Sequence, residues 1–224
     1  MNVNFLKEKF YGCSNSALLP IQEQSLEDYI KDLYKSEVKK SGRYFVQDEY
    51  VDENIRMVAG WIEGTYASCI MTGGLGIGKT ILMKSLMRLF DYIRDPITIP
   101  PLRCRHIVYY DAAEMCNKYV VSEDVKYEVS NCKVLFIDDL GCEAATYYSY
   151  GNVMKPIQEI MMSRYASRLP TVIATNLSLE EIVERYGERV ADRVDELYAT
   201  LEFPAHDSYR SLPLVRKVPT LSSK

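Results

Sequence analysis

The sequence lacks the features that identify membrane proteins, secreted proteins and zinc proteins. No apolar run approaches the roughly 20 residues of a membrane-spanning helix, and residues 1–10 contain Lys7, Glu8 and Lys9 in place of an apolar signal core. The six cysteines are scattered without a C-x-x-C pair, so neither a zinc site nor a disulfide framework is indicated. We therefore expect a cytoplasmic protein with reduced thiols and no membrane partner.

Positive charge is also not in excess, because 27 Lys and Arg stand against 31 Asp and Glu for a net charge of −4. Such a chain does not hold DNA by bulk electrostatics, so any DNA contact requires a local basic patch. Internal repeats and low-complexity tracts are absent. The apolar content of 47% and the length of 224 residues fit one well-buried α/β domain with an appendage.

Residues 73–80 (GGLGIGKT) match the phosphate-binding pattern G-x-x-x-x-G-K-[ST] at every fixed position. An apolar run of strand character precedes them, and residues 81–90 repeat apolar side chains at helical spacing. Glycines and a helix N-terminus turn backbone N–H groups toward a phosphate chain. We expect an ATP site in which Lys79 reaches the β and γ phosphates and Thr80 binds Mg²⁺. The predicted phosphate-loop contacts are Gly73, Gly74, Gly76, Ile77, Gly78, Lys79, Thr80 and Ile81.

Strands and helices alternate along the rest of the chain. Besides the strand before the phosphate loop, apolar runs predict strands at 106–110, 133–141, 170–176 and 201–203, with helical patterns between them. This alternation predicts an open, mostly parallel five-stranded sheet with helices on both faces, a three-layer α/β/α fold.

The region before the phosphate loop has a different pattern. Residues 25–34 form an amphipathic helix behind a Ser25 N-cap, which either docks on a partner or packs on the protein's own core. Residues 52–62 predict a second helix. Residues 43–46 fall where an adenine ring would be covered.

Three polar side chains end predicted strands: Asp138, Asp139 and Asn176. In a parallel sheet these strand ends meet at one site. Asp138 is suited to hold Mg²⁺ opposite Thr80, and Asp139 to orient or deprotonate an attacking water. Asn176 is placed to bond that water or the γ-phosphate. The alternative is that Asp139 caps the following turn, and Glu143 is then the next candidate for the base.

A capping box at 178–181 opens a helix that ends at Gly187. In the segment that follows, Arg189 and Arg193 are spaced i, i+4. They lie either on an exposed charged helix or in an arginine finger directed at the γ-phosphate of a neighbouring subunit.

Five segments follow one another along the chain: 73–80, 134–141 ending in DDLG, 174–176 (ATN), 186–193 (YGERVADR) and 207–211 (DSYRS). In this order they resemble the AAA+ ATPases of the DnaC-type replicative helicase loaders, over residues 50–212. The related IstB-type transposition ATPases look similar. The resemblance implies that Asp138 and Asp139 are the Walker B pair, Asn176 is sensor 1, Arg193 is the finger with Arg189 beside it, and Arg210 is a sensor 2-like contact.

The resemblance also implies an organisation and a function. It divides the chain into an N-terminal helical extension at 1–50, a candidate segment for docking a partner, an AAA+ ATPase core at 51–204 without a C-terminal helical lid, and a C-terminal segment at 205–224. We expect a self-associating ATPase that loads a replicative helicase on single-stranded DNA. Hydrolysis is expected to be slow, because Asp139 stands where most AAA+ proteins have Glu. Two alternatives are an IstB-like ATPase that recruits a transposase and an ATP-switched adaptor with little turnover.

A DNA-contacting surface is expected from two basic residues and a tyrosine cluster. Arg103 and Arg105 would neutralise phosphates, while the tyrosines of 147–150 stack on bases. The alternative is that these tyrosines face a protein partner or are half-buried. The basic tail at 205–224 would assist.

Overall fold

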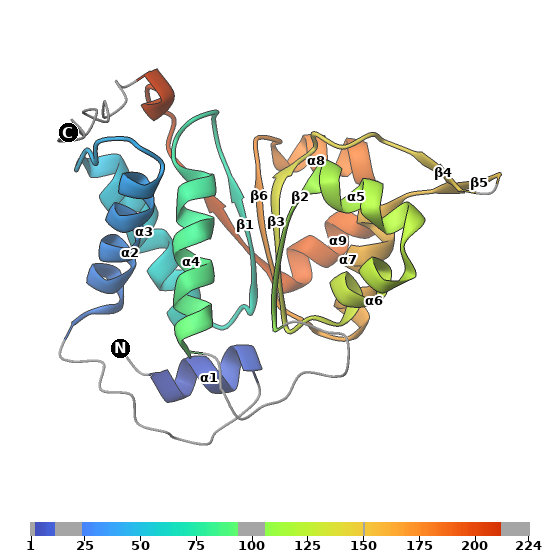
Figure 1. Ribbon diagram of the computed structural model, residues 1–224, viewed down its shortest axis with the longest axis horizontal. Helices are drawn as coiled ribbons and strands as arrows, with labels where there is room; N and C mark the ends of the chain where they lie inside the picture. The colour runs from blue at the N-terminus through green and yellow to red at the C-terminus, as the bar shows by residue number, and fades with distance from the viewer. Residues whose placement is uncertain (1–2, 12–23, 94–105, 150, 212–224) are drawn as a thin grey trace, which may run out of the picture.

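The structure, a computed structural model, describes residues 3–11, 24–93, 106–149 and 151–211, and its elements form three layers (Figure 1). The central layer is a five-stranded sheet made of β1 (Ser68–Thr72), β2 (Ile107–Asp111), β3 (Val134–Leu140), β6 (Thr171–Thr175) and β7 (Tyr198–Glu202). The strand order is β2-β3-β6-β1-β7, and every neighbouring pair is parallel. The prediction of an open parallel sheet with helices on both faces is confirmed.

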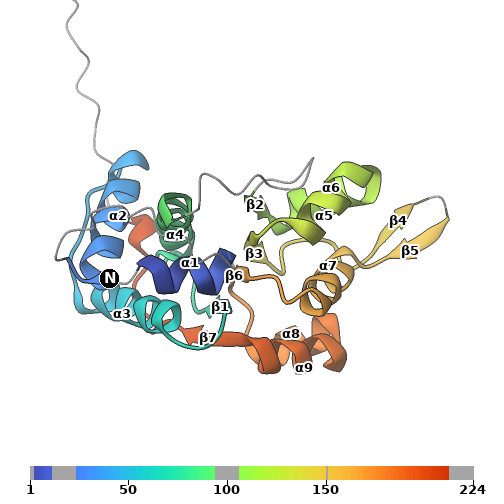
Figure 2. The ribbon, with the colours of Figure 1, turned by 90° about the horizontal axis from the view of Figure 1, so that it is seen from below.

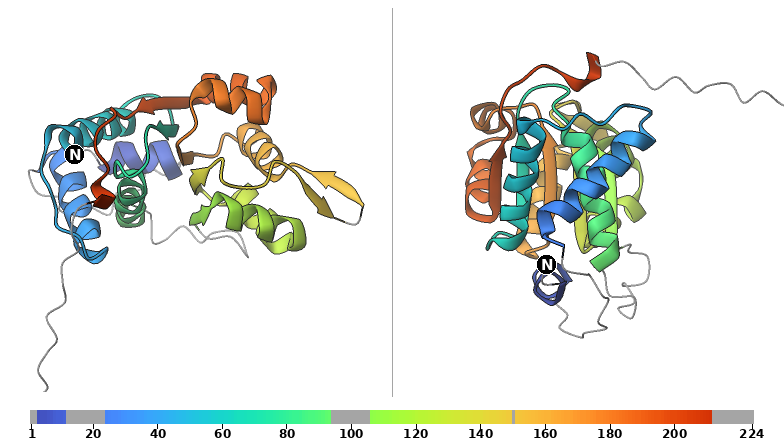
Figure 3. Two further views of the ribbon diagram at one scale, coloured as in Figure 1. Left: turned by 90° about the horizontal axis from the view of Figure 1, so that it is seen from above. Right: turned by 90° about the vertical axis from the view of Figure 1, so that its left-hand side faces the viewer.

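One face of the sheet is covered by the N-terminal helices and the helix after the phosphate loop, seen together in the right-hand view of Figure 3. These are α1 (Val3–Tyr11), α2 (Leu26–Lys40), α3 (Glu49–Glu63) and α4 (Lys79–Ile93). Helix α1 lies across the C-terminal end of α4, where the Tyr11 hydroxyl donates to the Phe90 carbonyl at 2.9 Å. The buried side chains of all four helices share one hydrophobic cluster with the sheet.

The amphipathic helix predicted behind Ser25 is α2, and the Ser25 hydroxyl accepts from the Asp28 amide as its N-cap. Its apolar side chains are buried among α3, α4 and the sheet, so this face packs on the protein's own core. The buried apolar residues are Leu26, Ile30, Tyr34 and Val38. Docking of a partner by residues 1–50, and the division of the chain at residue 50, stay predictions.

The opposite face is covered by helices from the second half of the chain. They are α5 (Ala112–Val121), α6 (Glu123–Asn131), α7 (Pro156–Ala166), α8 (Leu179–Tyr186) and α9 (Glu188–Leu197). The capping box predicted at 178–181 is present at the start of α8. A two-stranded hairpin, β4 (Tyr147–Ser149) with β5 (Asn152–Met154), projects from the body between β3 and α7 (Figure 2). Within the described ranges, none of the helices combines the length and apolar character needed to cross a membrane.

Two details near the strand ends matter for the site. The pairing of β3 with β6 shifts in register between Ile137 and Leu140, so the two carboxylates predicted there fall on an irregular strand end. The last strand begins at Tyr198, three residues before the predicted run at 201–203, because α9 ends at Leu197 and leads directly into it. After β7, a short turn η1 (Tyr209–Ser211) returns to the phosphate loop, above the N-terminal end of α4 in Figure 1.

Candidate nucleotide-binding site

The phosphate loop connects β1 to α4, and Lys79 is the first residue of the helix. The Lys79 Nζ donates to the carbonyl oxygens of Gly73 and Gly74, both at 2.7 Å, and to Asn176 Oδ1 at 2.8 Å. Burial lowers the pKa of Lys79 to about 8, although Asp139 and Asp138 nearby favour the charged form. The structure therefore brings the predicted lysine and the predicted sensor amide into contact across 97 residues of sequence.

The predicted metal ligands also meet. The Thr80 hydroxyl lies 3.3 Å from Asp138 Oδ1, and the other Asp138 oxygen accepts a 2.7 Å hydrogen bond from Tyr109. Asp138 is only 3% exposed. Thr80 and Asp138 would therefore supply oxygen ligands of the kind that Mg²⁺ prefers.

Asp139, the next residue, has a different environment. Its φ of 50° places a non-glycine residue in the left-handed region, at the irregular end of β3. No side-chain hydrogen bond or ion pair to its carboxylate occurs among the described residues, and it lines the nucleotide pocket. Burial raises the pKa of Asp139, with the Asp138 and Asp111 charges acting in the same direction. This carboxylate is available to a ligand.

The pocket has a volume of about 210 Å³ and two kinds of wall. One wall is the phosphate loop with Asp139, Asn176 and Arg210. The other is largely apolar and comes from α2, the segment that leads to α3, and the first turn of α3. The residues of this second wall are Tyr34, Val38, Ser41, Arg43, Tyr44, Phe45, Val46 and Val51. Residues 43–46, which the sequence placed over an adenine ring, thus border the site.

The phosphate-loop residues divide into two groups around this pocket. Gly76, Ile77, Gly78, Lys79, Thr80 and Ile81 line it. Gly73 and Gly74 contribute through their carbonyl contacts with Lys79.

Tyr34 was not predicted to be a site residue. Its hydroxyl lies so close to Gly78 that a Cβ there would come within 2.4 Å of it, and Gly78 has a φ of +99°. Glycine is required at this position by both its conformation and its neighbour. The amphipathic pattern of α2 indicated that Tyr34 would be buried, but it did not indicate against what.

Arg210 is held at the mouth of the pocket by its neighbours. The Tyr209 amide donates to the Gly76 carbonyl at 3.1 Å, and the Tyr209 hydroxyl donates to both Asp48 oxygens at 2.8 and 2.9 Å. Arg43 donates to the carbonyl oxygens of Tyr209 and Arg210 at 3.1 and 3.2 Å. The C-terminal segment is thereby tied to the phosphate loop on one side and to the N-terminal half on the other.

The two candidate finger residues lie on α9, outside the lining of this pocket. The Arg193 guanidinium lies over the Tyr165 ring at 4.5 Å and pairs with Glu196 at 3.2 Å. Arg189 is exposed. Neither is brought to the chain's own phosphate loop, a placement that fits both an exposed charged helix and a finger directed at a neighbouring subunit.

Part of the predicted DNA surface lies outside the described residues, namely Arg103, Arg105 and Tyr150. The described tyrosines of that cluster lie on β4. Tyr148 is 73% exposed, whereas Tyr147 is half-buried and its hydroxyl accepts from the Ala144 amide at 3.3 Å. Only Tyr148 among these two presents its ring to solvent.

The strand order with the central phosphate loop and the polar strand ends of β3 and β6 defines an α/β P-loop NTPase fold. No family model matches the chain. It is 28% identical over 166 residues to the replicative helicase loader DnaC of Escherichia coli strain K12, covering 73% of this chain and 61% of DnaC. The chain is homologous to that protein, and its features are consistent with the DnaC-type AAA+ family. It spans about three-fifths of the length of the DnaC proteins it matches.

Solved structures share the fold. The crystal structure of DnaI superposes with a TM-score of 0.52 at 17% identity, covering 78% of this chain and 94% of that one. AMPPCP-bound DnaA from Aquifex aeolicus superposes with a TM-score of 0.51 at 15% identity, covering 74% of this chain and 50% of that one. These likenesses show that the chain shares the fold of those structures.

Proposed function

We propose that this protein is an ATP-hydrolysing AAA+ protein that acts in DNA replication as a helicase loader on single-stranded DNA. The observation that carries the proposal is the meeting of Lys79 with Asn176 and of Thr80 with Asp138 at one end of the sheet. Homology to DnaC supports the replicative helicase as the protein partner.

The residues present fit ATP and Mg²⁺. The phosphate loop and Lys79 would hold the phosphates, with Arg210 at the pocket mouth. The wall at residues 43–46, together with α2, would cover the base. Thr80 and Asp138 would hold Mg²⁺, which, when bound, neutralises charge on the phosphate oxygens.

Hydrolysis replaces the bond from the γ-phosphorus to the bridging oxygen by a bond to a water oxygen. Asp139 is the group to orient that water and accept its proton, because its carboxylate faces the pocket without a partner among the described residues. Asn176, which accepts a hydrogen bond from Lys79, would bond that water or the γ-phosphate. An Asp side chain is one methylene shorter than Glu, so slow turnover is expected.

Completion of the site requires a second copy of the chain. Arg193 lies outside its own pocket, so it would stabilise charge at the γ-phosphate of a neighbour in an ATP-dependent oligomer. To reach it, the guanidinium would leave Glu196 and Tyr165. An exposed ion pair of this kind contributes about 0–1 kcal/mol, a small barrier to exchange.

A loading assay tests the proposal. The protein, the replicative helicase of its host and a circular single-stranded DNA are combined with ATP and Mg²⁺, and the helicase retained on the circle is measured together with phosphate release. We expect ATP-dependent retention that is lost in Lys79→Ala and kept in Lys84→Ala, an exposed lysine on the same helix.

Three outcomes would contradict it. Helicase that is never retained would remove the loader role. Assembly only on duplex DNA with recruitment of a transposase would favour the IstB-like alternative. ATP binding without phosphate release under any of these conditions would favour the ATP-switched adaptor.

A further inference from the structure

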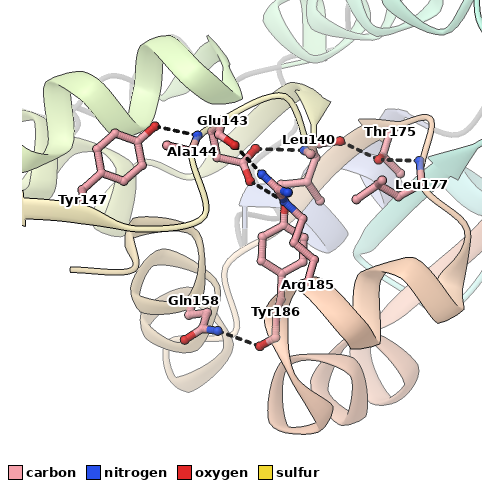
Figure 4. Close-up of polar contacts among 10 residues, drawn as sticks. Leu140, Glu143, Ala144, Tyr147, Gln158, Thr175, Leu177, Arg185 and Tyr186 are labelled. Atoms are coloured by element: carbon pink, nitrogen blue, oxygen red, sulfur yellow. Dashed lines mark hydrogen bonds and ion pairs between the residues drawn. The ribbon is translucent and has the colours of Figure 1, made fainter. Parts of the chain in front are cut away.

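Glu143 follows the β3 strand end by three residues and is 4% exposed. Its Oε2 accepts from the Gly141 amide at 2.9 Å, and its Oε1 accepts from the Tyr186 hydroxyl at 2.6 Å and from Arg185 Nε at 3.1 Å. Arg185 also donates to the Glu143 carbonyl. Figure 4 shows this carboxylate held between the turn after β3 and the end of α8.

These contacts argue against a role for Glu143 as the base. A general base needs an open lone pair within hydrogen-bond reach of the water it deprotonates. Glu143 is buried, its carboxylate already accepts three hydrogen bonds, and the described residues that line the nucleotide pocket include Asp139 but not Glu143. If Asp139 acts on water, Glu143 acts elsewhere.

Glu143 accepts a hydrogen bond from the turn at residues 139–141, and the backbone of this turn determines where the Asp139 side chain points. Asp139 has φ 50° and Gly141 has φ 104°, two left-handed residues with Leu140 between them. A Cβ on Gly141 would come within 2.7 Å of Leu177. A non-glycine residue in this region is strained and persists only where its surroundings fix it.

Two hydrogen bonds join this turn to the side chains of Glu143 and Thr175, in addition to the bonds from the Cys142 amide to the Asp139 carbonyl at 3.1 Å and from the Asp139 amide to Asp138 Oδ1 at 3.0 Å. The Gly141 amide is held by Glu143, and the Leu140 carbonyl accepts from the Thr175 hydroxyl at 2.6 Å (Figure 4). Thr175 ends β6 and directly precedes Asn176, so this second bond joins the turn to the predicted sensor strand.

We propose that Glu143 is a positioning residue that aims Asp139 into the nucleotide pocket, with Arg185 and Tyr186 holding its carboxylate. The inference rests on the proposed function, since it concerns the hydrolysis step. The same contacts also connect the Asp139 turn to α8 and to α9, which carries Arg193. Tyr186 is the last residue of α8, its carbonyl accepts from Gln158 at 2.8 Å, and α9 with Arg193 begins two residues later.

The test compares Glu143→Gln with Glu143→Ala by phosphate release and by ATP binding. The glutamine amide oxygen still accepts from Gly141, so turnover should stay within about tenfold of the wild type after loss of the charge pair with Arg185. Alanine frees the turn and should lower kcat on the order of 10²-fold, the size expected for a misplacement of about 1 Å. ATP affinity should be unchanged in both, and Glu184→Ala on α8 should match the wild type.

Two further variants keep the test decisive. In an Asp139→Asn background, Glu143→Ala should produce no further loss, because it acts through Asp139. Tyr186→Phe, which removes one donor and keeps the ring, should lower kcat less than Glu143→Ala and also leave ATP affinity unchanged, so the test does not depend on one variant folding.

The outcomes separate cleanly. The positioning role is overturned if Glu143→Gln is as inactive as Asp139→Asn. It is also overturned if Glu143→Ala and Tyr186→Phe are both as active as the wild type. In either case the proposed function stands. A wild-type protein that binds ATP and never hydrolyses it would overturn both.

Discussion

Two carboxylates four residues apart, Asp139 and Glu143, have opposite surroundings. The Glu143 oxygens accept three hydrogen bonds, including one from a guanidinium. Asp139 accepts no side-chain hydrogen bond among the described residues, lies in the left-handed region and lines the pocket. A buried carboxylate whose lone pairs are used stabilises structure, whereas one left open in a pocket is available for chemistry. Residue type alone does not separate the two.

The same contrast separates two regions of the site. One is the pocket end, at the nucleotide pocket, and the other is the α8 end, where Glu143 contacts Arg185 and Tyr186. At the pocket end, polar groups converge on a space that a ligand would fill, as Lys79, Thr80 and Asp139 do. At the α8 end, they converge on one another. We therefore expect substitutions at the pocket end to change ATP binding or chemistry with little loss of stability, and substitutions at the α8 end to change geometry.

The largest expected effect lies outside both ends, in Arg193. If it acts on a neighbour, Arg193→Ala should bind ATP almost normally and lose roughly 10³–10⁵ in hydrolysis rate. Arg193→Lys should fail nearly as badly, because an ammonium cannot replace the planar guanidinium. Mixing Arg193→Ala with Lys79→Ala should restore some turnover, measured as phosphate release. If the two variants co-assemble and the mixture stays inactive, Arg193 is only a surface charge. Glu188→Ala, on the same helix, is the control for Arg193→Ala.

The next largest effect tests the pocket end directly. Lys79→Ala removes charge-assisted hydrogen bonds to the phosphates worth about 1.5–3 kcal/mol each, so ATP affinity should fall roughly 10²–10⁴-fold. Titration of a fluorescent ATP analogue measures it, with Lys84→Ala as control. Unchanged affinity would remove the assignment of this pocket to ATP.

A smaller effect is expected on the hairpin. Tyr148 is 73% exposed and lies on β4, and the β4–β5 hairpin projects from the body (Figure 2). If its ring stacks on a base at about 1–3 kcal/mol, Tyr148→Ala should weaken single-stranded DNA binding ~5–150-fold. Tyr127→Ala, an exposed tyrosine on α6, is the control. If the two variants bind single-stranded DNA with equal affinity, Tyr148 does not contact DNA, and the alternative that it faces a protein partner is favoured.

The smallest effect concerns the proton on Lys79. Its pKa is lowered to about 8 in the free protein, and bound phosphates would favour the charged form and raise that pKa again. ATP binding near pH 8.5 should therefore take up less than one proton, uptake should vanish near pH 6.5, and affinity should fall as pH rises above about 8. Calorimetry in buffers of different ionisation enthalpy measures this. Uptake that persists in Lys79→Arg, which stays charged, would assign it to another group.

The sheet could be predicted because its central strands are continuous apolar runs that can be recognised in the local sequence. The apolar runs before Gly73, Asp138 and Asn176 each became a buried parallel strand. The hairpin at 147–154 was missed, because its tyrosines were interpreted as a contact surface and its strands are only three residues long. Helix α1 was missed as well, although Leu6 and Phe10 are spaced i, i+4 and both are buried.

The supports of the site could not be predicted, because they join residues far apart in the chain. Tyr34 reaches Gly78 from α2, and Arg185 reaches Glu143 from α8. Nothing in the local pattern around Glu143 distinguishes a base from a positioning residue. That distinction depends on which hydrogen-bond donors lie against the carboxylate in the folded protein. The structure shows that they come from Gly141, Arg185 and Tyr186.

The most direct test of the account is a paired measurement on Asp139→Asn, taking phosphate release and thermal stability together. The raised pKa of Asp139 means that folding favours its protonated form, so its cost to the unfolding free energy appears as pH rises past the usual Asp range and is full above the raised pKa. Asparagine carries no such cost and tolerates the left-handed region well.

At pH 7 we predict that Asp139→Asn binds ATP normally, loses turnover and is more stable than the wild type by up to about 1 kcal/mol, part of the 1–3 kcal/mol strain of such a residue. The part of the gain that comes from the Asp139 charge should shrink as the pH falls toward the usual Asp range, while the part that comes from the backbone conformation should persist. A variant that hydrolyses ATP at the wild-type rate, or one that is less stable at pH 7, would contradict the assignment of Asp139 as the open carboxylate of the site.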